Sequence, residues 1–342
     1  MPPPPHISTD LAIVGAGPAG LFATCYAGLR GLDVTVLDSL PEIGGQIAAL
    51  YPEKLIHDVA GTPAVKGRDL VEALAIQAQS AAPRYLLGDA VEGLSVSRAN
   101  DGQATGVSLT TAGGSAVHAG AVLLTAGVGS FSPRPLATAH DWHGRGLMYF
   151  VPEPQRLAGA DVVIVGGGDS AVDWALTLEP VARSVVLVHR RDTFRAHAHT
   201  VGLLKSSRVE VITPAEITAV HGDTHVEHVE ITGLAGEGAR GRSATHIVAA
   251  LGFSARLGPI RQWGLDIAAN RHIRVDTRMA TSLDRVFAAG DITDYRGKVR
   301  LIAVGFGEAA TAVNNIAALL DPQAPVFPGH STDLAPTTTA TG

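Results

Sequence analysis

The sequence predicts an α/β protein with two doubly wound domains, each carrying a small antiparallel β insert. Three observations support this prediction. A strand–glycine turn–helix–strand unit occupies residues 10–38, a second copy occupies residues 161–191, and a segment of alternating apolar and polar residues follows each copy. The offset between the copies is 151 residues, both from Gly15 to Gly166 and from Asp38 to His189. Equal internal spacing indicates two Rossmann-like nucleotide sites in one chain.

The first unit has the residues that a dinucleotide site requires. After a short apolar strand, Gly15, Gly17 and Gly20 follow at G-x-G-x-x-G spacing. Gly15 allows the tight turn, Gly17 lets the backbone approach a pyrophosphate, and Gly20 lets the helix pack closely on the strand. The helix N-terminus offers unpaired N–H groups to phosphates. A second apolar strand ends at Asp38, which can accept hydrogen bonds from a ribose. In a glycine-rich chain the glycines alone could arise by chance, and their context is what predicts the site.

The second unit differs from the first at its end. Gly166, Gly168 and Ala171 repeat the glycine spacing, with alanine accepted at the third position. Instead of a carboxylate, the unit ends in residues 189–191, His-Arg-Arg, with Arg195 close behind. An acid would repel a 2′-phosphate, whereas guanidinium groups bind one in bidentate fashion. The first site therefore suits FAD or NAD and the second suits NADP. The alternative for the arginines is a solvated basic face.

Composition and charge narrow the class of protein. The chain has 342 residues, of which 46% are hydrophobic and 17% charged, and this predicts a globular protein of two domains. The net charge of −6 does not indicate nucleic-acid binding. Cys25 is the only cysteine, so the chain cannot form an internal disulfide and a cytoplasmic location is expected. Residues 11–29 are uncharged, but glycines and Pro18 interrupt them, so no membrane span is predicted. Residues 1–5 and 335–342 are expected to be disordered ends.

Periodicity and turn residues predict the remaining elements. The connection between the first unit and the next helix is long for a surface loop, so we expect it to have a function. The predicted elements are a loop over 39–61, a helix over 67–82, an antiparallel meander over 85–118, a strand over 122–126, a second antiparallel insert over 209–233, a strand over 247–251, a strand over 285–291 and a helix over 301–320.

The motifs together resemble those of ferredoxin/flavodoxin–NADP⁺ reductases of the thioredoxin-reductase-like type. The matching segments cover nearly the whole chain and are GAGPAGL at 15–21, GGQ at 44–46, LYPEK at 50–54, DVAG at 58–61, LTAGVGSFSPR at 124–134, VGGGDSAVDWAL at 165–176, HRRDTFRAH at 189–197, AAGDITD at 288–294, GFGEAATAVNN at 305–315 and HST at 330–332. The glycine and AAGD motifs are shared by many flavoprotein reductases. The loop over 44–61, HRRDTFRAH and HST are narrower signals.

The resemblance implies FAD on the first unit and NADP(H) on the second. Asp38 would bind the adenosine ribose, Tyr51 would stack on the flavin, Asp291 would bind the ribityl chain, and Ser331 or Thr332 would reach the isoalloxazine from this chain or from the partner subunit of a homodimer. The residues implied for FAD are Gly15, Gly17, Pro18, Ala19, Gly20, Asp38, Gly45, Gln46, Tyr51, Val91, Phe131, Asp291, Ser331 and Thr332. Those implied for NADP(H) are Gly166, Gly167, Gly168, Asp169, Ser170, Ala171, Arg190, Arg191 and Arg195.

The most informative departure is that the second unit lacks the C-x-x-C pair of thioredoxin reductases. The flavin is then the only internal electron carrier. We expect NADPH to give a hydride to flavin N5 and the flavin to release single electrons to an external carrier. A helix starting near residues 304–305 would stabilise the reduced flavin, and no side chain is needed as acid or base. A metal site needs three or four convergent ligands, and none is predicted.

The expected domains are an FAD domain of residues 6–131 and 254–342 and an NADP domain of residues 132–253, with hinges near 131–135 and 251–255. The expected partner is ferredoxin or flavodoxin. Both are acidic, so Arg296, Lys298 and Arg300 are candidate docking residues, with a solvated loop as the alternative. Two other functions stay open at this point: a dithiol-free reductase of a disulfide, a quinone or oxygen, and a flavin-based redox sensor. Cys25, on an apolar helix run, is expected to be a core residue.

Overall fold

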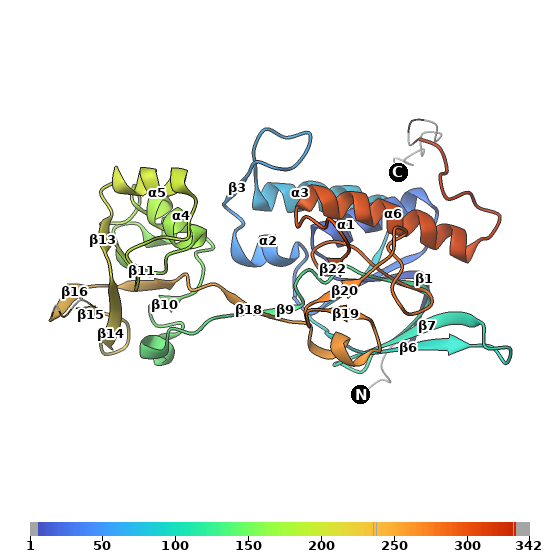
Figure 1. Cartoon of the computed structure of the whole chain (residues 1–342), viewed down its shortest axis with the longest axis horizontal. Helices are drawn as coiled ribbons and strands as arrows, with labels where there is room; N and C mark the ends of the chain where they lie inside the picture. Colours follow the sequence, from blue (N-terminus) through green and yellow to red (C-terminus); the bar gives the residue numbers. More distant parts are fainter. Residues whose placement is uncertain (1–5, 235, 237, 331, 333–342) are drawn as a thin grey trace, which may run out of the picture. The chain divides into compact units, whose positions relative to one another are not determined.

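The computed structural model describes residues 6–330, apart from 235 and 237, and residue 332. The chain divides into two compact units (Figure 1). Unit 1 comprises Met1–Ser130 and Arg256–Gly342, and unit 2 comprises Phe131–Ala255. The chain passes between them twice, and the strands at the two passages, β9 (Ser130–Pro133) and β18 (Phe253–Arg256), pair with each other.

A mixed sheet, with parallel and antiparallel pairs, forms the centre of unit 1. Its strand order is β5-β2-β1-β8-β7-β6, with β21 also on β8. The bounds are β1 (His6–Val14), β2 (Val34–Asp38), β5 (Arg84–Leu87), β6 (Val91–Arg98), β7 (Ala104–Thr111), β8 (Ala116–Leu124) and β21 (Val286–Ala288). One edge of β8 pairs in parallel with β1, while its other edge pairs antiparallel with β7 in its first half and parallel with β21 in its second.

This sheet corrects the sequence prediction at two points. The expected meander over 85–118 contains only β6, β7 and the start of β8, because β5 instead pairs in parallel with β2. The strand expected over 122–126 is the second half of β8, so one strand belongs both to the meander and to the parallel sheet. Alternation shows that a segment is extended but does not identify its partner.

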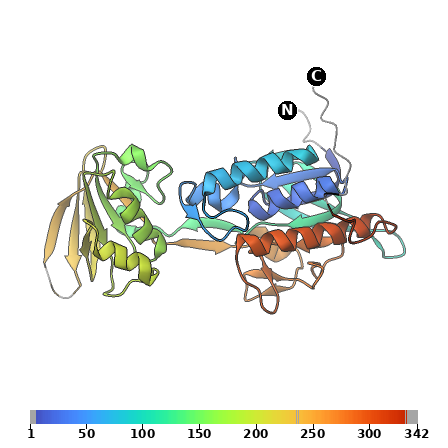
Figure 2. The same ribbon diagram turned by 90° about the horizontal axis from the view of Figure 1, so that it is seen from above.

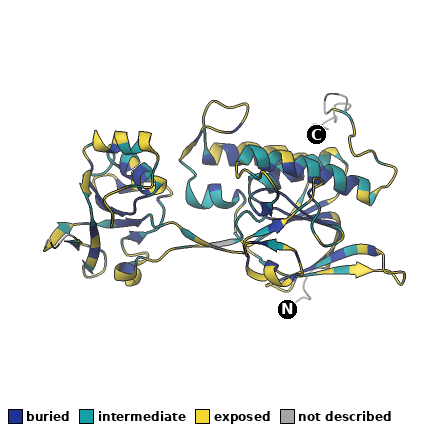
Figure 3. Ribbon diagram, viewed as in Figure 1, coloured by how far each residue is buried: buried dark blue, intermediate teal, exposed yellow. Residues whose placement is uncertain are grey.

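Helices cover one face of this sheet, and a smaller layer that contains β19, β20 and β22 covers the other. The helices α1 (Pro18–Leu29), α3 (Gly67–Ala78) and α6 (Ile302–Leu320) lie side by side (Figure 2). Along β1, Leu11 and Ile13 face the helices, whereas Ala12 and Val14 face the other layer, so the strand is buried on both sides (Figure 3). The smaller elements are α2 (Gly45–Leu50), β3 (Leu55–Ile56), β4 (Val65–Lys66), η1 (Gln79–Ala81), η4 (Gly258–Gln262), β19 (Ile267–Ala268), β20 (His272–Arg274) and β22 (Thr293–Asp294).

Among the described residues, α6 is the one helix whose length and composition would allow it to cross a membrane. It is instead a core helix of unit 1. Ala309, Ala312, Val313 and Ile316 are buried against α1 and the sheet, and Glu308 on the same helix is buried in an ion pair.

Unit 2 repeats the architecture on a smaller scale. Its sheet, β10-β17-β11-β12-β13, is entirely parallel. Val162 and Ile164 of β11 face α4, while Val163 and Val165 face an antiparallel three-stranded sheet, β14-β15-β16. The bounds are η2 (Ala137–Trp142), β10 (Leu147–Met148), η3 (Pro154–Leu157), β11 (Asp161–Val165), α4 (Asp169–Leu178), β12 (Ser184–Val188), α5 (Ala198–Lys205), β13 (Glu210–Ile212), β14 (Ala215–His221), β15 (His228–Gly233), β16 (Ala239–Ser243) and β17 (His246–Ala249).

The predicted second insert is correct only as the β14–β15 hairpin. The segment before it, β13, pairs in parallel with β12 and belongs to the main sheet. The third strand of the insert, β16, was not predicted, because its sequence ARGRS has no apolar alternation. It pairs with β15 along its whole length.

Candidate cofactor-binding sites

The glycine turn of unit 1 joins β1 to α1 and leaves no room for side chains at two positions. Gly15 has φ +117°, and a Cβ there would lie 2.5 Å from the carbonyl oxygen of Thr125. A Cβ on Gly20 would lie 1.8 Å from the carbonyl oxygen of Gly15. The Thr125 hydroxyl donates a hydrogen bond to that same carbonyl (2.7 Å). The first and third glycines therefore bring strand, helix and β8 into close approach.

Gly17, the middle glycine, lies in open space. Its φ is −74°, and a Cβ there would meet nothing nearer than the Cα of Gly45 at 3.9 Å. Gly17 is the N-cap of α1, Pro18 and Ala19 follow it, and no side chain caps the first turn of the helix. An uncapped helix N-terminus beside a position kept free of side chain fits a pyrophosphate.

The GGQ segment lies against this turn. The Gly44 N–H donates to the Ala16 carbonyl (2.8 Å). Gly45 has φ +55°, and a Cβ there would lie 2.9 Å from the Cα of Gly17. Gln46 is the second residue of α2, and its side-chain nitrogen would be 2.8 Å from a Cβ on Gly127. The loop that carries GGQ therefore contacts the glycine turn at the N-terminus of α1.

Asp38, the residue predicted to bind a ribose, lies at the end of β2. Its carboxylate accepts hydrogen bonds from the N–H groups of Ala16 (2.6 Å) and Leu40 (2.8 Å). Burial raises the pKa of Asp38, against the effect of these backbone donors. The Asp89 N–H donates to the Asp38 carbonyl (3.2 Å), which brings the start of β6 at Val91 beside it. Asp38 and Val91 therefore belong to one neighbourhood.

Asp291 lies close enough to Tyr51 to affect its ionisation. Gly290, which precedes Asp291, has φ +82°, and a Cβ there would lie 3.2 Å from the Cβ of Ala19. A Cβ on Gly305 of α6 would lie 3.5 Å from the Cα of Gly290. Burial and the neighbouring carboxylates, Asp291 first, raise the pKa of the Tyr51 hydroxyl. The N-terminal ends of α1 and α6 and the end of β21 therefore meet here, next to the residues implied for the flavin.

Lys298 is not the docking residue that the sequence predicted. Its side chain is only 2% exposed and its ammonium pairs with Glu308, so it is not available to a protein partner. Arg296 is exposed, and Arg300 is 39% exposed at 3.9 Å from Asp294. Position in a basic loop predicted a surface lysine, but the loop folds back over α6. The signal for burial was Glu308, the one charged residue in α6.

The glycine turn of unit 2 has the same geometry as that of unit 1. A Cβ on Gly166 would lie 2.4 Å from the Ala250 carbonyl oxygen, just as Gly15 abuts Thr125. Gly168, the counterpart of Gly17, has no heavy atom within 4 Å of an added Cβ. It is the N-cap of α4, and no side chain caps that helix. The arrangement leaves a second free space at a helix N-terminus, next to the buried Ala171.

Residues 189–197, which carry three arginines and are here called the arginine segment, lie against this second turn. The Arg195 N–H donates to the Gly167 carbonyl (2.7 Å). Arg190, Arg191 and Arg195 are exposed, and all three lower the pKa of His189, after the larger effect of burial. Within the described part of the chain, none of the three forms an ion pair or a side-chain hydrogen bond. Their positive charges are therefore not neutralised by an ion pair among the described residues.

Asp169 and Ser170 form the exposed first turn of α4. The Asp169 carboxylate accepts a hydrogen bond from the His197 N–H (2.8 Å), so it ties the end of the arginine segment to the helix. Their assignment to NADP(H) stays a prediction.

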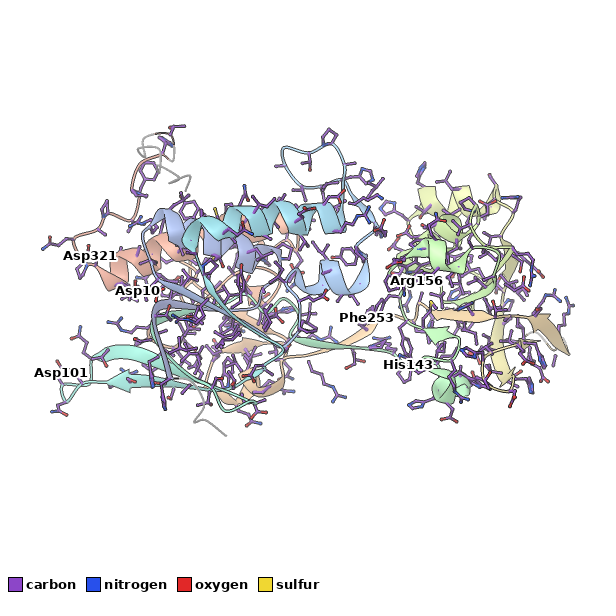
Figure 4. The ribbon with its side chains drawn as sticks, turned by 180° about the vertical axis from the view of Figure 1, so that it is seen from behind. Asp10, Asp101, His143, Arg156, Phe253 and Asp321 are labelled. Atoms are coloured by element: carbon purple, nitrogen blue, oxygen red, sulfur yellow. The ribbon has the colours of Figure 1, made fainter. Side chains whose placement is uncertain are left out.

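Three of the predicted flavin residues are not brought to the site by what the structure describes. Ser331 and the side chain of Phe131 lie outside the described residues. Thr332 is exposed and follows a segment that leaves α6 at its C-terminal end, after Asp321 (Figure 4). Arg30, at the C-terminal end of α1, donates to the carbonyls of Pro325 and Val326 there. This anchor is at the opposite ends of α1 and α6 from Gly17 and Gly305.

The class of protein follows from a family match. The model of the pyridine nucleotide-disulphide oxidoreductase family matches residues 9–314 of this chain. The chain therefore belongs to that family, and within it to the group of the ferredoxin–NADP reductases, as its closely similar relatives indicate.

Two of those relatives illustrate the similarity. The Ferredoxin–NADP reductase of Salinispora tropica is 60% identical over 324 residues, which cover 95% of this chain and 98% of the relative. That of Nocardioides sp. is 60% identical over 333 residues, which cover 97% and 99%. The resemblance inferred from the motifs is confirmed.

Solved structures confirm the predicted fold class. Thioredoxin reductase from Lactococcus lactis superposes with a TM-score of 0.73 at 21% identity, covering 91% of this chain and 99% of that one. Thioredoxin reductase from T. acidophilum gives 0.74 at 23% identity, covering 91% and 98%. These similarities concern the fold alone.

Proposed function

We propose that this chain is a ferredoxin–NADP⁺ reductase, an enzyme that carries electrons between NADPH and ferredoxin through FAD. The observation that carries the proposal is the difference between two equivalent glycine turns. The first is followed by a carboxylate, Asp38, which suits a free ribose hydroxyl. The second is followed by three exposed arginines, which suit a 2′-phosphate. The names of the relatives supply ferredoxin as the partner.

FAD would be held by unit 1. The N-terminus of α1 at Gly17 would bind the pyrophosphate, Asp38 the ribose, and Tyr51 and Asp291 the flavin end. FAD, when bound, supplies the chemistry: it exchanges a hydride with the nicotinamide and single electrons with the protein carrier. The chain itself positions the coenzymes and sets the local charge. The uncapped N-terminal end of α6 near Gly305 favours negative charge at the flavin.

The chain has no dithiol through which electrons could pass. Cys25 is its only cysteine, and burial raises the pKa of the Cys25 thiol. A protonated thiol is a poor nucleophile, and a single one cannot form an internal disulfide. These properties support a protein electron acceptor rather than a disulfide substrate.

Rates with several acceptors test the proposal. The flavin-loaded protein is mixed anaerobically with NADPH and then with ferredoxin, flavodoxin, thioredoxin, a quinone or oxygen. We expect NADPH to bleach the flavin absorbance, and ferredoxin or flavodoxin to restore it fastest. A protein that cannot be loaded with flavin would contradict the coenzyme assignment. Faster turnover with thioredoxin, a quinone or oxygen would contradict the partner assignment alone.

Arg296 and Arg300 are the proposed docking residues for the acidic carrier. They flank Val299, an apolar side chain that is 53% exposed, and Arg300 has only a distant carboxylate, Asp294, beside it. Basic side chains around an exposed apolar residue suit an acidic protein partner.

Charge reversal at both positions tests this surface. In Arg296→Glu/Arg300→Glu we expect the ratio of ferredoxin to ferricyanide turnover to fall at least tenfold at low salt, because steering charges change sign. Arg84→Glu, on the exposed start of β5, is the matched control. An unchanged ratio in the double variant, or an equal fall in the control, would contradict the assignment.

The proposal for the C-terminal segment is that it acts within a homodimer. The segment that leads to Ser331 and Thr332 is anchored by Arg30 at the far ends of α1 and α6. This supports a dimer in which these residues reach the partner subunit's flavin. We place the enzyme in the cytoplasm, where a single thiol stays reduced.

A further inference from the structure

Lys298 and Glu308 form an ion pair in the interior of unit 1. Their side chains are 2% and 4% exposed. Oε2 of Glu308 accepts hydrogen bonds from the Gly290 N–H (2.7 Å) and the Thr293 hydroxyl (3.4 Å). Oε1 accepts from the Tyr295 hydroxyl (2.6 Å) and from the Lys298 ammonium. Four donors on one buried carboxylate make a fully satisfied network.

This network closes the segment over residues 290–298 into a ring. Gly290 at its start donates to Glu308, and Lys298 at its end pairs with the same carboxylate. The Lys298 ammonium also donates to the Gly290 carbonyl (3.0 Å), so the pair binds both backbone polar groups of Gly290. Asp291 is the next residue. The hydrogen bonds to Gly290 therefore fix where the backbone of Asp291 lies in the structure.

The ring also fixes the two helices that meet at the site. Glu308 is carried by α6, and Gly290 lies between Gly305 of α6 and Ala19 of α1, at the spacings given above. One side chain thus links the start of α6, the start of α1 and Asp291. Lys298 contributes the opposite charge, so the pair adds no net charge to the interior.

Stability alone is a weak reason for such a pair. Removing two charges from water costs free energy, and an apolar pair of similar volume often stabilises a fold equally well. A buried polar network instead selects one arrangement of the groups that it binds. Here those groups are the backbone of Gly290 and the N-terminal part of α6, which begins beside it.

We propose that Glu308 and Lys298 are positioning residues for FAD, which hold Asp291 and the N-terminal end of α6 in the geometry that binds the flavin end. The inference rests on the proposed function, because it requires FAD in unit 1. Neither residue touches the reacting atoms.

FAD titration of the apoprotein tests the proposal. Lys298→Met and Glu308→Gln each leave one buried partner without its counterpart, so a loss of fold could explain a loss of binding. The double variant Lys298→Met/Glu308→Gln removes both charges and keeps an amide oxygen for the Gly290 N–H. We expect it to unfold close to the wild-type urea midpoint, to bind FAD at least tenfold more weakly, and to change the visible circular dichroism of the bound flavin.

Two controls separate positioning from general damage. Arg98→Met breaks the Arg98–Asp284 ion pair of the same unit and should leave the Kd for FAD unchanged. The Kd for NADPH should also be unchanged in the double variant, because unit 2 holds that site. A double variant with the wild-type Kd and flavin dichroism would overturn the positioning role. A wild-type chain that binds no FAD would instead overturn the proposed function.

Discussion

The imidazole of His189 lies directly against the backbone of Gly167. A Cβ on Gly167 would be 2.2 Å from one ring carbon and within 2.4 Å of both ring nitrogens. The ring also stacks on Phe194, with centroids 5.3 Å apart. The arginine segment therefore contacts the glycine turn through the His189 ring. A side chain at position 167 would clash with that ring.

Gly167→Ala should displace this segment and weaken NADPH binding. We expect the Kd for NADPH to rise roughly tenfold, equivalent to about 1.4 kcal/mol, while FAD binding is unchanged. Isothermal titration with NADPH measures the effect. Gly202→Ala in α5 is the control, because an added Cβ there meets nothing within 4 Å. Equal affinities in the two variants would show that His189 does not seat the segment.

Arg190→Gln/Arg191→Gln should abolish the preference for NADPH over NADH. A hydrogen bond to a charged group contributes about 1.5–3 kcal/mol, so the loss of both guanidinium groups should raise the KM for NADPH at least tenfold. The KM for NADH should not rise, because NADH lacks the 2′-phosphate. Arg208→Gln, which breaks only the exposed ion pair with Glu179, serves as the control. Parallel losses with both nucleotides would exclude a 2′-phosphate role.

These experiments concern residues that sequence reasoning could find because their signals are local. The spacing of Gly15, Gly17 and Gly20 predicts a turn whose first and third positions are crowded and whose middle position is open, and the structure has that turn. The same holds for Gly166 and Gly168. Such features depend on a few consecutive φ, ψ angles and on one helix packing on one strand.

Contacts between residues far apart in the chain could not be predicted from the sequence in this way. The pairing of β5 with β2 and the burial of Lys298 depend on segments far apart in the chain or on the course of a loop. Arg296, Lys298 and Arg300 share one basic stretch, yet only Lys298 turns inward, where Glu308 receives it. A lone acid within an otherwise uncharged α6 was the available signal for that partner.

Asp161→Asn should change the acid stability of unit 2. The Asp161 carboxylate accepts hydrogen bonds from Arg183, Ser184 (2.7 Å) and Ser243 (3.0 Å), and these donors, Arg183 above all, hold the pKa of Asp161 well below its usual range. Because the folded-state pKa is below the unfolded value of about 3.9, the ionised group stabilises the fold above about pH 4, and this contribution is lost as the pH falls toward the folded-state pKa.

Urea unfolding as a function of pH measures the difference. The wild type should be more stable than Asp161→Asn at pH 7, and the gap should narrow steadily below about pH 4. Asp223→Asn, on the exposed turn between β14 and β15, should follow the wild-type curve. A gap that stays constant down to about pH 3 would show that the carboxylate is not held ionised by its donors.

Gly17→Ala and Gly168→Ala should have reciprocal effects on the two coenzymes. Both glycines have negative φ, −74° and −98°, and neither has a heavy atom within 3.4 Å of an added Cβ, so alanine should not strain the apoprotein. The methyl group would instead fill the space in front of a helix N-terminus. Gly17→Ala should therefore raise the Kd for FAD at least tenfold and leave the Kd for NADPH unchanged, while Gly168→Ala should do the reverse.

Gly20→Ala is the contrasting variant. Its added Cβ would lie 1.8 Å from the Gly15 carbonyl oxygen, so this substitution destabilises the fold itself. If Gly17→Ala lowered the unfolding midpoint as much as Gly20→Ala, the open space at Gly17 would be a packing requirement and not a phosphate site.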